Sequence, residues 1–162
     1  MACKHKVLIV EDHTEIRQLM ALFLRRAGFD VAEAATGVAA IEQARATLPD
    51  LIIMDLGLPG MTGDEATEKL KADPSTKDIP VIVNTAFHDG TPIVERAIAA
   101  GAVEILHKPT TFKTLQATLY RYLPVATQET NFQADDPPKT SRPEQRSRTP
   151  LLPWVSARFR TL

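Results

Sequence analysis

Five short apolar runs alternate with segments whose apolar residues recur at helical spacing, and this alternation constrains the fold more than any other feature. The runs lie at residues 7–10, 29–33, 51–54, 79–83 and 103–106. Three of them are almost continuous in Leu, Ile, Val and Met, which is typical of strands covered on both faces. Strands that alternate with helices at this spacing form βαβ units with right-handed crossovers. We therefore expect an α/β fold, a doubly wound five-stranded parallel sheet with helices on both faces.

Five helices are expected between and after these strands. The first helix is expected to end just before Gly28. Helical spacing predicts that its inward face consists of Ile16, Leu19, Met20, Phe23 and Leu24. Thr36 can cap a second helix that runs to Leu48, with Val38 and Ile41 on its apolar face. The other three are expected at 65–71, from Pro92 to before Gly101, and from Thr110 or Thr111 onward.

The composition changes near residue 123. Residues 1–123 carry 13 basic and 16 acidic side chains, a net charge of −3, whereas residues 124–162 have a net charge of +2 and hold six of the twelve prolines. We expect one compact domain over 1–123 and a disordered, Pro/Arg-rich tail over 124–162. The last twelve residues carry Trp154 and Phe159 beside two arginines. We expect a flexible terminus there rather than a segment that docks onto a partner or an anionic surface.

Composition also excludes several classes of protein. The net charge of −1 disfavours an electrostatic nucleic-acid binder, and no apolar run approaches the ~20 residues of a membrane span. Cys3 is the only cysteine, so no intrachain disulfide and no cysteine-based zinc site can form, and a cytoplasmic location is expected. The 39 residues after 123 are too few for an effector domain, so we expect a single-domain protein without direct DNA binding.

Polar residues stand where four of the five strands are expected to end, at the sheet edge where such folds place their chemistry. They are Glu11, Asp12, Asp55, Thr85 and Lys108. Clustered carboxylates need a counter-ion, and oxygen ligands suit Mg²⁺. Asp55 can act as a nucleophile in phosphoryl transfer, while Lys108 and Thr85 offer donors to phosphoryl oxygens. Phosphorylation could therefore drive a conformational switch.

Four motifs at these strand ends resemble those of the receiver domains of two-component response regulators. In order, they are VLIVEDH, IIMDLGLPGMTGDE, VNTAF and ILHKP, and the resemblance covers roughly residues 6–123. It implies a flavodoxin-like, CheY-like sheet with strand order 2-1-3-4-5. It also implies that a sensor histidine kinase or a phosphotransfer protein donates a phosphoryl group to the domain, which then changes its affinity for a downstream protein target.

The resemblance assigns a role to each strand-end residue. Asp55 corresponds to the phosphoacceptor, Thr85 to the switch hydroxyl and Lys108 to the lysine that contacts phosphate. The implied Mg²⁺ ligands are Glu11, Asp12, Asp55 and the backbone carbonyl of Gly57. The Lys108–Pro109 peptide bond is expected to be cis.

The chain departs from the usual family pattern in two respects. Ile105 stands where relatives carry a Tyr, Phe or His that rotates on phosphorylation, so we expect a buried or half-buried strand residue there instead. Gly57 and Phe87 occupy the positions that control water attack on the phosphoryl group, and together they leave the phosphoryl lifetime open. His107 is expected to be an outward or packed ring rather than a metal ligand, and His13 to cap or flank the first helix.

Other functions compete with a switch that has its own output. A phosphate sink or phosphorelay intermediate is the main alternative, which Ile105 slightly favours. An aspartyl-nucleophile phosphatase is disfavoured, because Gly57 stands where such an enzyme would carry a general acid. A degenerate scaffold is disfavoured because all five chemical positions are filled. We expect signalling through protein contacts, with no enzymatic activity beyond self-catalysed phosphorylation and dephosphorylation.

Overall fold

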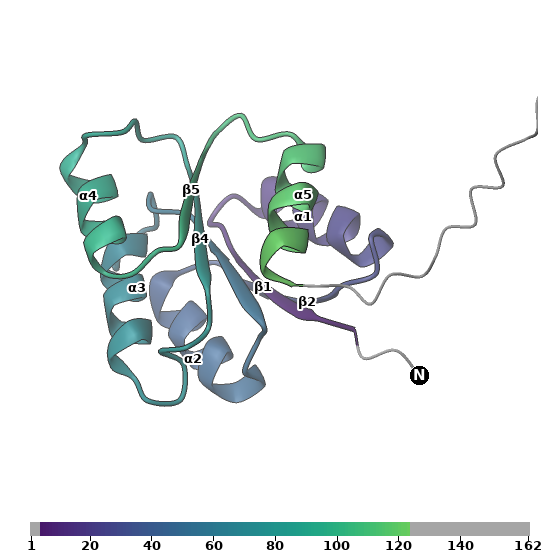
Figure 1. Cartoon of the computed structure of the whole chain (residues 1–162), viewed down its shortest axis with the longest axis horizontal. Helices are drawn as coiled ribbons and strands as arrows, with labels where there is room; N and C mark the ends of the chain where they lie inside the picture. Colours follow the sequence, from purple (N-terminus) through teal and green to yellow (C-terminus); the bar gives the residue numbers. More distant parts are fainter. Residues whose placement is uncertain (1–3, 124–162) are drawn as a thin grey trace, which may run out of the picture. The chain divides into compact units, whose positions relative to one another are not determined.

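A computed structural model describes residues 4–123, so the predicted tail at 124–162 lies outside the described residues. Strands and helices alternate along this part of the chain (Figure 1). In chain order they are β1 (Lys6–Val10), α1 (Thr14–Arg26), β2 (Asp30–Ala34), α2 (Gly37–Thr47), β3 (Leu51–Met54), α3 (Gly63–Ala72), β4 (Val81–Thr85), α4 (Pro92–Ala99), β5 (Glu104–His107) and α5 (Phe112–Tyr122).

The five strands form one sheet in the order β2-β1-β3-β4-β5, and every neighbouring pair is parallel. The register aligns the strand ends in pairs, because Val10 at the end of β1 lies opposite Met54 at the end of β3, and Thr85 at the end of β4 lies opposite His107 at the end of β5. The predicted doubly wound α/β fold and its strand order are confirmed. The carboxyl ends of β1, β3, β4 and β5 therefore lie along one edge of the sheet.

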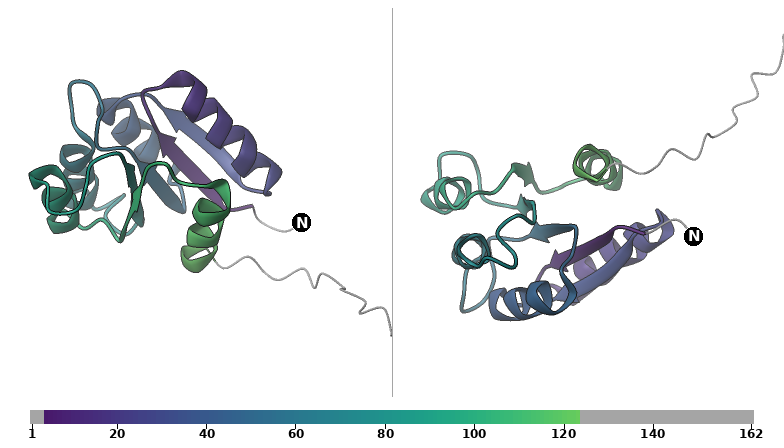
Figure 2. Two further views of the ribbon diagram at one scale, coloured as in Figure 1. Left: turned by 90° about the horizontal axis from the view of Figure 1, so that it is seen from above. Right: turned by 60° about the horizontal axis from the view of Figure 1, so that its bottom comes forward.

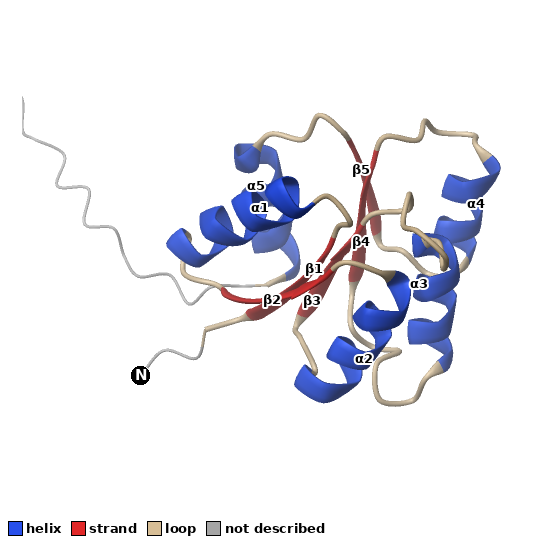
Figure 3. Cartoon of the chain, turned by 180° about the vertical axis from the view of Figure 1, so that it is seen from behind, coloured by secondary structure: helices blue, strands red, loops and turns tan. Residues whose placement is uncertain are grey.

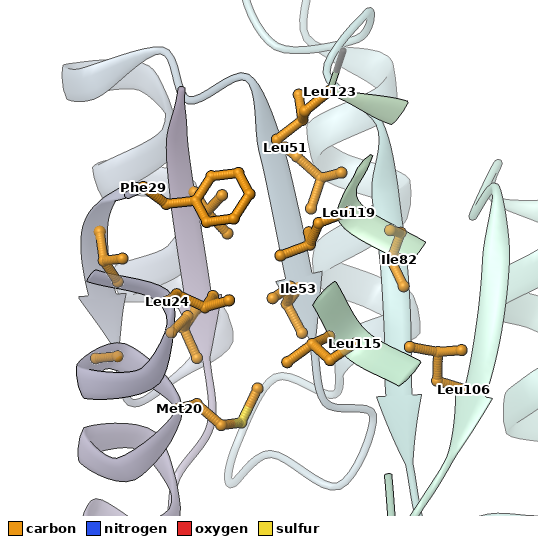
Figure 4. Packing of buried hydrophobic residues seen from close by; sticks show 14 residues of the cluster. Met20, Leu24, Phe29, Leu51, Ile53, Ile82, Leu106, Leu115, Leu119 and Leu123 are labelled. Atoms are coloured by element: carbon orange, nitrogen blue, oxygen red, sulfur yellow. The ribbon is translucent and has the colours of Figure 1, made fainter. Parts of the chain in front are cut away.

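The helices cover both faces of the sheet (Figures 2 and 3). Side chains of α1 and α5, among them Leu24 and Leu119, pack with Ile53 on one face (Figure 4). Side chains of α2 and α3 pack against alternate strand residues such as Ile52 on the other face. There, Val94 of α4 packs in a smaller cluster beside β4 and β5. Burial on both faces gives the strand ends a rigid base.

Four of the five strands, β1, β2, β4 and β5, differ from the sequence-based prediction by one or two residues at their ends. β4 begins at Val81, because Pro80 has no amide hydrogen for the strand ladder. The strand also includes Thr85, which we had expected to follow it. β2 begins at Asp30 because the amide of Phe29 donates a hydrogen bond to the carbonyl of Leu24 in α1, at 3.0 Å, so Phe29 belongs to the end of that helix. β5 spans Glu104–His107, one residue later than predicted.

The predicted inward faces of the first two helices are partly wrong. In α1, Met20 and Leu24 are buried as predicted, but Ile16 and Leu19 are 43% and 54% exposed. The buried stripe of this helix is narrow because α1 lies mainly over β1 and β2, near the edge of the sheet, and packs beside α5. In α2, Val38 is exposed while Ile41 is buried.

The helix starts follow the predicted caps more closely. Thr36 and Thr111 accept hydrogen bonds from backbone amides three residues on, which confirms both as caps. Pro92 opens α4 as predicted. α3 starts at Gly63, two residues earlier than expected, because Thr62 and Glu65 form a capping box. Within residues 4–123, no helix is long and apolar enough to cross a bilayer.

Candidate functional site

The predicted site residues meet at the carboxyl edge of the sheet, and backbone hydrogen bonds fix three of them. The amide of Glu11 donates to Ala34 just beyond β1, and the amide of Asp55 donates to Val10 just beyond β3. The amide of Lys108 donates to the carbonyl of Thr85 at 2.8 Å. The strand ladder therefore continues into the residues that carry the side chains.

Lys108 joins the two most buried carboxylates of this edge. Its Nζ donates to Asp55 Oδ2 and to Glu11 Oε2, both at 2.6 Å, and the Glu11 side chain is only 2% exposed. Burial lowers the pKa of Lys108, but the two hydrogen bonds and the charges of Asp55 and Glu11 outweigh it and hold that pKa above its ordinary value. The ammonium group therefore stays charged and offsets the repulsion between the two acids.

Asp12 supplies a third carboxylate, one oxygen of which is buried without a hydrogen bond. The Nδ1 atom of His13 lies 3.0 Å from Asp12 Oδ1 but does not have hydrogen-bond geometry with it. Ligand atoms of Glu11, Asp12 and His13 all lie within 4.8 Å of one another. A buried carboxylate oxygen without a hydrogen bond is costly, and a hard cation would satisfy it, so these acids fit the predicted Mg²⁺.

His13 is less suited to hold that ion. It is the N-cap residue of α1 but makes no capping bond with its side chain. A hydrogen bond to Glu11 and the charge of Asp12 raise its pKa, which favours the protonated ring that cannot ligate a metal. We therefore keep His13 as a flanking residue, in line with the sequence-based expectation.

Asp55 Oδ1 accepts a hydrogen bond from the backbone amide of Gly57 at 3.2 Å. A Cβ atom at Gly57 would lie 3.7 Å from Cε2 of Phe87 and 3.9 Å from Asp55 Oδ1, both ordinary contact distances. The edge of the Phe87 ring thus lies at the rim of the site. The role of the Gly57 carbonyl as a metal ligand stays a prediction.

Sequence reasoning missed the structural role of Gly63. A Cβ atom there would lie 2.0 Å from the backbone oxygen of Asp55, so the first turn of α3 packs directly against Asp55 only because residue 63 has no side chain. The glycine appears in the second motif, but a single sequence does not reveal which backbone approaches it.

Two further polar residues hold the site loops and were also missed. Arg17 of α1 donates from Nη1 to the carbonyl of Glu11 at 2.6 Å, which fixes the loop after β1. Thr110 donates to Asn84 Oδ1 at 2.7 Å, which ties the turn after β5 to β4. The Lys108–Pro109 bond within that turn is cis, as predicted.

Thr85 and Ile105 differ in their surroundings. The Thr85 side chain is fully buried, and its Oγ1 accepts a hydrogen bond from the amide of Phe87 at 3.3 Å. Ile105 is half-buried and packs with Val83 and Val94 in the cluster beneath α4, as expected for an apolar strand residue. No aromatic ring is therefore available at position 105 to respond to Thr85.

Residues 7–120 match the family described as the response regulator receiver domain. The chain belongs to this receiver family. It is 34% identical over 128 residues to the phosphate regulon transcriptional regulatory protein PhoB of Escherichia coli, covering 76% of this chain and 56% of PhoB. It is 32% identical over 114 residues to the DNA-binding response regulator MtrA of Mycobacterium tuberculosis, covering 70% and 48%. The chain thus spans about half the length of these curated relatives.

Solved receiver structures resemble this receiver domain closely. The chemotaxis protein CheY4 of Vibrio cholerae superposes with a TM-score of 0.69 at 34% identity, covering 75% of this chain and all of CheY4. The receiver domain of the sensor histidine kinase PA1611 from Pseudomonas aeruginosa has a TM-score of 0.68 at 30% identity, covering 74% and 98%. That structure holds a magnesium ion coordinated in its active site cleft.

Proposed function

We propose that this receiver domain accepts a phosphoryl group onto Asp55, from a sensor histidine kinase or a phosphotransfer protein, and so changes its affinity for a downstream protein. The observation that carries this proposal is the position of Lys108, whose Nζ lies 2.6 Å from Asp55 Oδ2 and 2.6 Å from Glu11 Oε2. A charged donor beside a carboxylate at the strand edge is what a transferred phosphoryl group requires.

In the transfer, a carboxylate oxygen of Asp55 attacks the phosphorus of a phosphohistidine. The P–N bond breaks, its electron pair stays on the donor imidazole, and that ring takes up a proton from water. We assign Glu11, Asp12, Asp55 and the Gly57 carbonyl to hold a Mg²⁺ ion, which would neutralise charge on the phosphoryl oxygens. Lys108 then pairs its ammonium with a phosphoryl oxygen in place of the Asp55 carboxylate.

Thr85 connects the phosphoryl group to the rest of the fold. Its hydroxyl accepts from the amide of Phe87, and within residues 4–123 no group accepts its proton, so it can donate to a phosphoryl oxygen. Hydrogen bonds to a charged group contribute about 1.5–3 kcal/mol each, so Thr85 and Lys108 together supply ~3–6 kcal/mol. Reversing a 1:99 population requires about 5.5 kcal/mol. Phosphorylation can therefore shift this loop between two states.

The test is phosphorylation by a small acyl phosphate in the presence of Mg²⁺. We expect a mass gain of one phosphoryl group that is lost in base, no gain for Asp55→Asn, and no gain when a chelator removes the metal. Asp78→Asn, which changes an exposed carboxylate outside the site, is the matched control and should label like the parent. Labelling of Asp55→Asn at the parental level would overturn the assignment.

A phosphate sink or relay intermediate is the second candidate, and the apolar Ile105 is the observation that favours it. Transfer from a panel of histidine kinases, followed by pull-down with the phosphorylated form, distinguishes the two functions. A protein that binds only after phosphorylation supports an output of this domain's own, whereas onward transfer to a phosphotransfer protein without such a partner supports the relay.

A further inference from the structure

His107, the last residue of β5, binds the loop between β4 and α4 at two points. Its Nδ1 lies 2.9 Å from the backbone oxygen of Phe87, and its Nε2 lies 3.0 Å from Asp89 Oδ1. Both partners are acceptors, so the ring is the donor. The Phe87 contact requires a proton on Nδ1, which both the neutral Nδ1–H tautomer and the imidazolium supply.

Together with Thr85, His107 holds the backbone of Phe87 at both of its polar groups. The Phe87 amide donates to Thr85 Oγ1 and the Phe87 carbonyl accepts from His107. The same loop leads into α4, where the Thr91 hydroxyl donates to the carbonyl of His88 at 2.7 Å. Any movement of Thr85 toward a phosphoryl group therefore acts on a residue that β5 also holds.

The position of Phe87 matters because its ring edge and the reacting carboxylate both border the space above the Gly57 Cα atom. The ring carbon Cε2 lies 3.7 Å from where a Gly57 Cβ would be, and that point is 3.9 Å from Asp55 Oδ1. Gly57 has no side chain to shield this side of Asp55. The Phe87 ring is thus the group that can restrict water there, provided that its backbone stays in place.

We propose that His107 is a positioning residue of this site, which holds the Phe87 backbone so that the ring slows hydrolysis of the phosphorylated Asp55. The inference rests on the proposed function, because it concerns the lifetime of the phosphoryl group. In hydrolysis, a water oxygen attacks phosphorus and the P–O bond to Asp55 breaks. The electron pair returns to the carboxylate, and the proton of the water leaves with inorganic phosphate.

Two variants separate the two contacts of the ring. Asn at position 107 places its amide nitrogen near the position of Nδ1 and keeps the Phe87 contact. Gln reaches toward the position of Nε2 and keeps the Asp89 contact instead. We expect His107→Ala and His107→Gln to lose the phosphoryl group about 2- to 10-fold faster, the change that one lost hydrogen bond produces. His107→Asn should stay close to the parent.

The control is His88→Ala. His88 is exposed in the same loop, and its side chain makes no hydrogen bond, ion pair or ring contact with residues 4–123. This variant removes a histidine from the loop without touching the Phe87 carbonyl, so its phosphoryl lifetime should equal that of the parent.

A second measurement, hydrogen exchange of residues 86–91 in the unphosphorylated full chain, tests the contact without relying on phosphorylation. We expect faster exchange in His107→Ala and His107→Gln only. Unchanged loop exchange in His107→Ala overturns the positioning role, and so does faster exchange with an unchanged phosphoryl lifetime. A parent that is never labelled contradicts the proposed function, while the exchange result still decides whether His107 holds the loop.

Discussion

Gly63 has no side chain because the backbone of Asp55 occupies the space where one would lie. Glycine is usually chosen for a turn with positive φ, but here the requirement is one of distance. Gly57, six residues closer to the strand, has room for a methyl group at ordinary contact distances. The structure therefore requires glycine at position 63 for lack of space, but not at position 57. Measuring the stability of an alanine variant at each position tests this difference.

We expect Gly63→Ala to destabilise the domain by about 1–3 kcal/mol, the usual cost of overpacking, because the first turn of α3 must move away from Asp55. Gly57→Ala should stay within about 0.5 kcal/mol of the parent, as substitutions without a steric conflict do. Urea unfolding of both variants checks this. Equal losses in the two would contradict the close approach at Gly63.

At the scale of helices and strands, α1 shows why a helical pattern predicts an element better than its inward face. Ile16, Leu19, Met20 and Leu24 all fit one helical stripe in the sequence, but only the last two are buried. Which part of the stripe is covered depends on where the sheet and α5 lie, and that depends on contacts between segments far apart in the chain. Single-sequence periodicity does not contain this information.

Leu24→Ala should lose about 2–5 kcal/mol of unfolding free energy, because Leu24 is fully buried in the core between α1, α5 and the sheet. Leu19→Ala on the same helix should cost less than about 0.5 kcal/mol, because more than half of Leu19 is exposed. Chemical denaturation of the two single variants gives both numbers. If Leu19→Ala lowered the unfolding free energy as much as Leu24→Ala does, Leu19 would belong to the inward face of the helix, as the sequence predicts.

Asp73, which follows α3, makes stability depend on pH. Hydrogen bonds from the Ser75 hydroxyl and amide, and from Arg45 of α2, lower the pKa of Asp73 from 3.8 to about 2. A carboxyl group whose folded pKa is depressed adds stability above its unfolded pKa and loses it as the pH falls through the folded value. Its contribution is therefore complete above pH 4 and is lost toward pH 2.

For Asp73→Asn we expect a lower urea midpoint than the parent at pH 5 and a smaller difference at pH 2. Asp78→Asn is the control, because Asp78 is an exposed acid in the same connection whose side chain makes no hydrogen bond with residues 4–123. A difference between Asp73→Asn and the parent that stays constant from pH 5 to pH 2 would show that the Asp73 charge does not stabilise the fold.

The residues of the candidate site could be predicted from the sequence almost one by one. The residues that hold the loops of the site in place could not. Strand ends are marked by apolar runs that stop at charged residues, so Glu11, Asp55 and Lys108 stand out without a structure. Arg17 and His107 act through backbone carbonyls of other segments. Carbonyls carry no sequence signal, so only the folded arrangement reveals such partners.

For the whole molecule, the acidic edge couples metal binding to stability. An ion that binds only the folded domain stabilises it by about 2.7 kcal/mol at a concentration 100 times its dissociation constant. We therefore expect Mg²⁺ to raise the melting temperature of the parent. Asp12→Asn should lose most of this increase, because it removes one of the predicted ligand carboxylates. In chelator its melting temperature should stay close to that of the parent, because the buried Asp12 oxygen makes no hydrogen bond there.

Differential scanning calorimetry with and without Mg²⁺ gives both melting temperatures, and Asp78→Asn again serves as the control. A full Mg²⁺ response in Asp12→Asn would remove Asp12 from the predicted ligand set.

The contact between Lys108 and Glu11 joins residues 97 positions apart in the chain. During synthesis the ribosome releases the acidic residues long before the lysine that balances their charge, and β5 is the last strand to reach the sheet. A nascent chain that ends before β5 therefore has carboxylates without their ammonium partner. Under the proposed function, such a chain also lacks the lysine that a transferred phosphoryl group requires, so only a domain translated through its final strand can accept the signal.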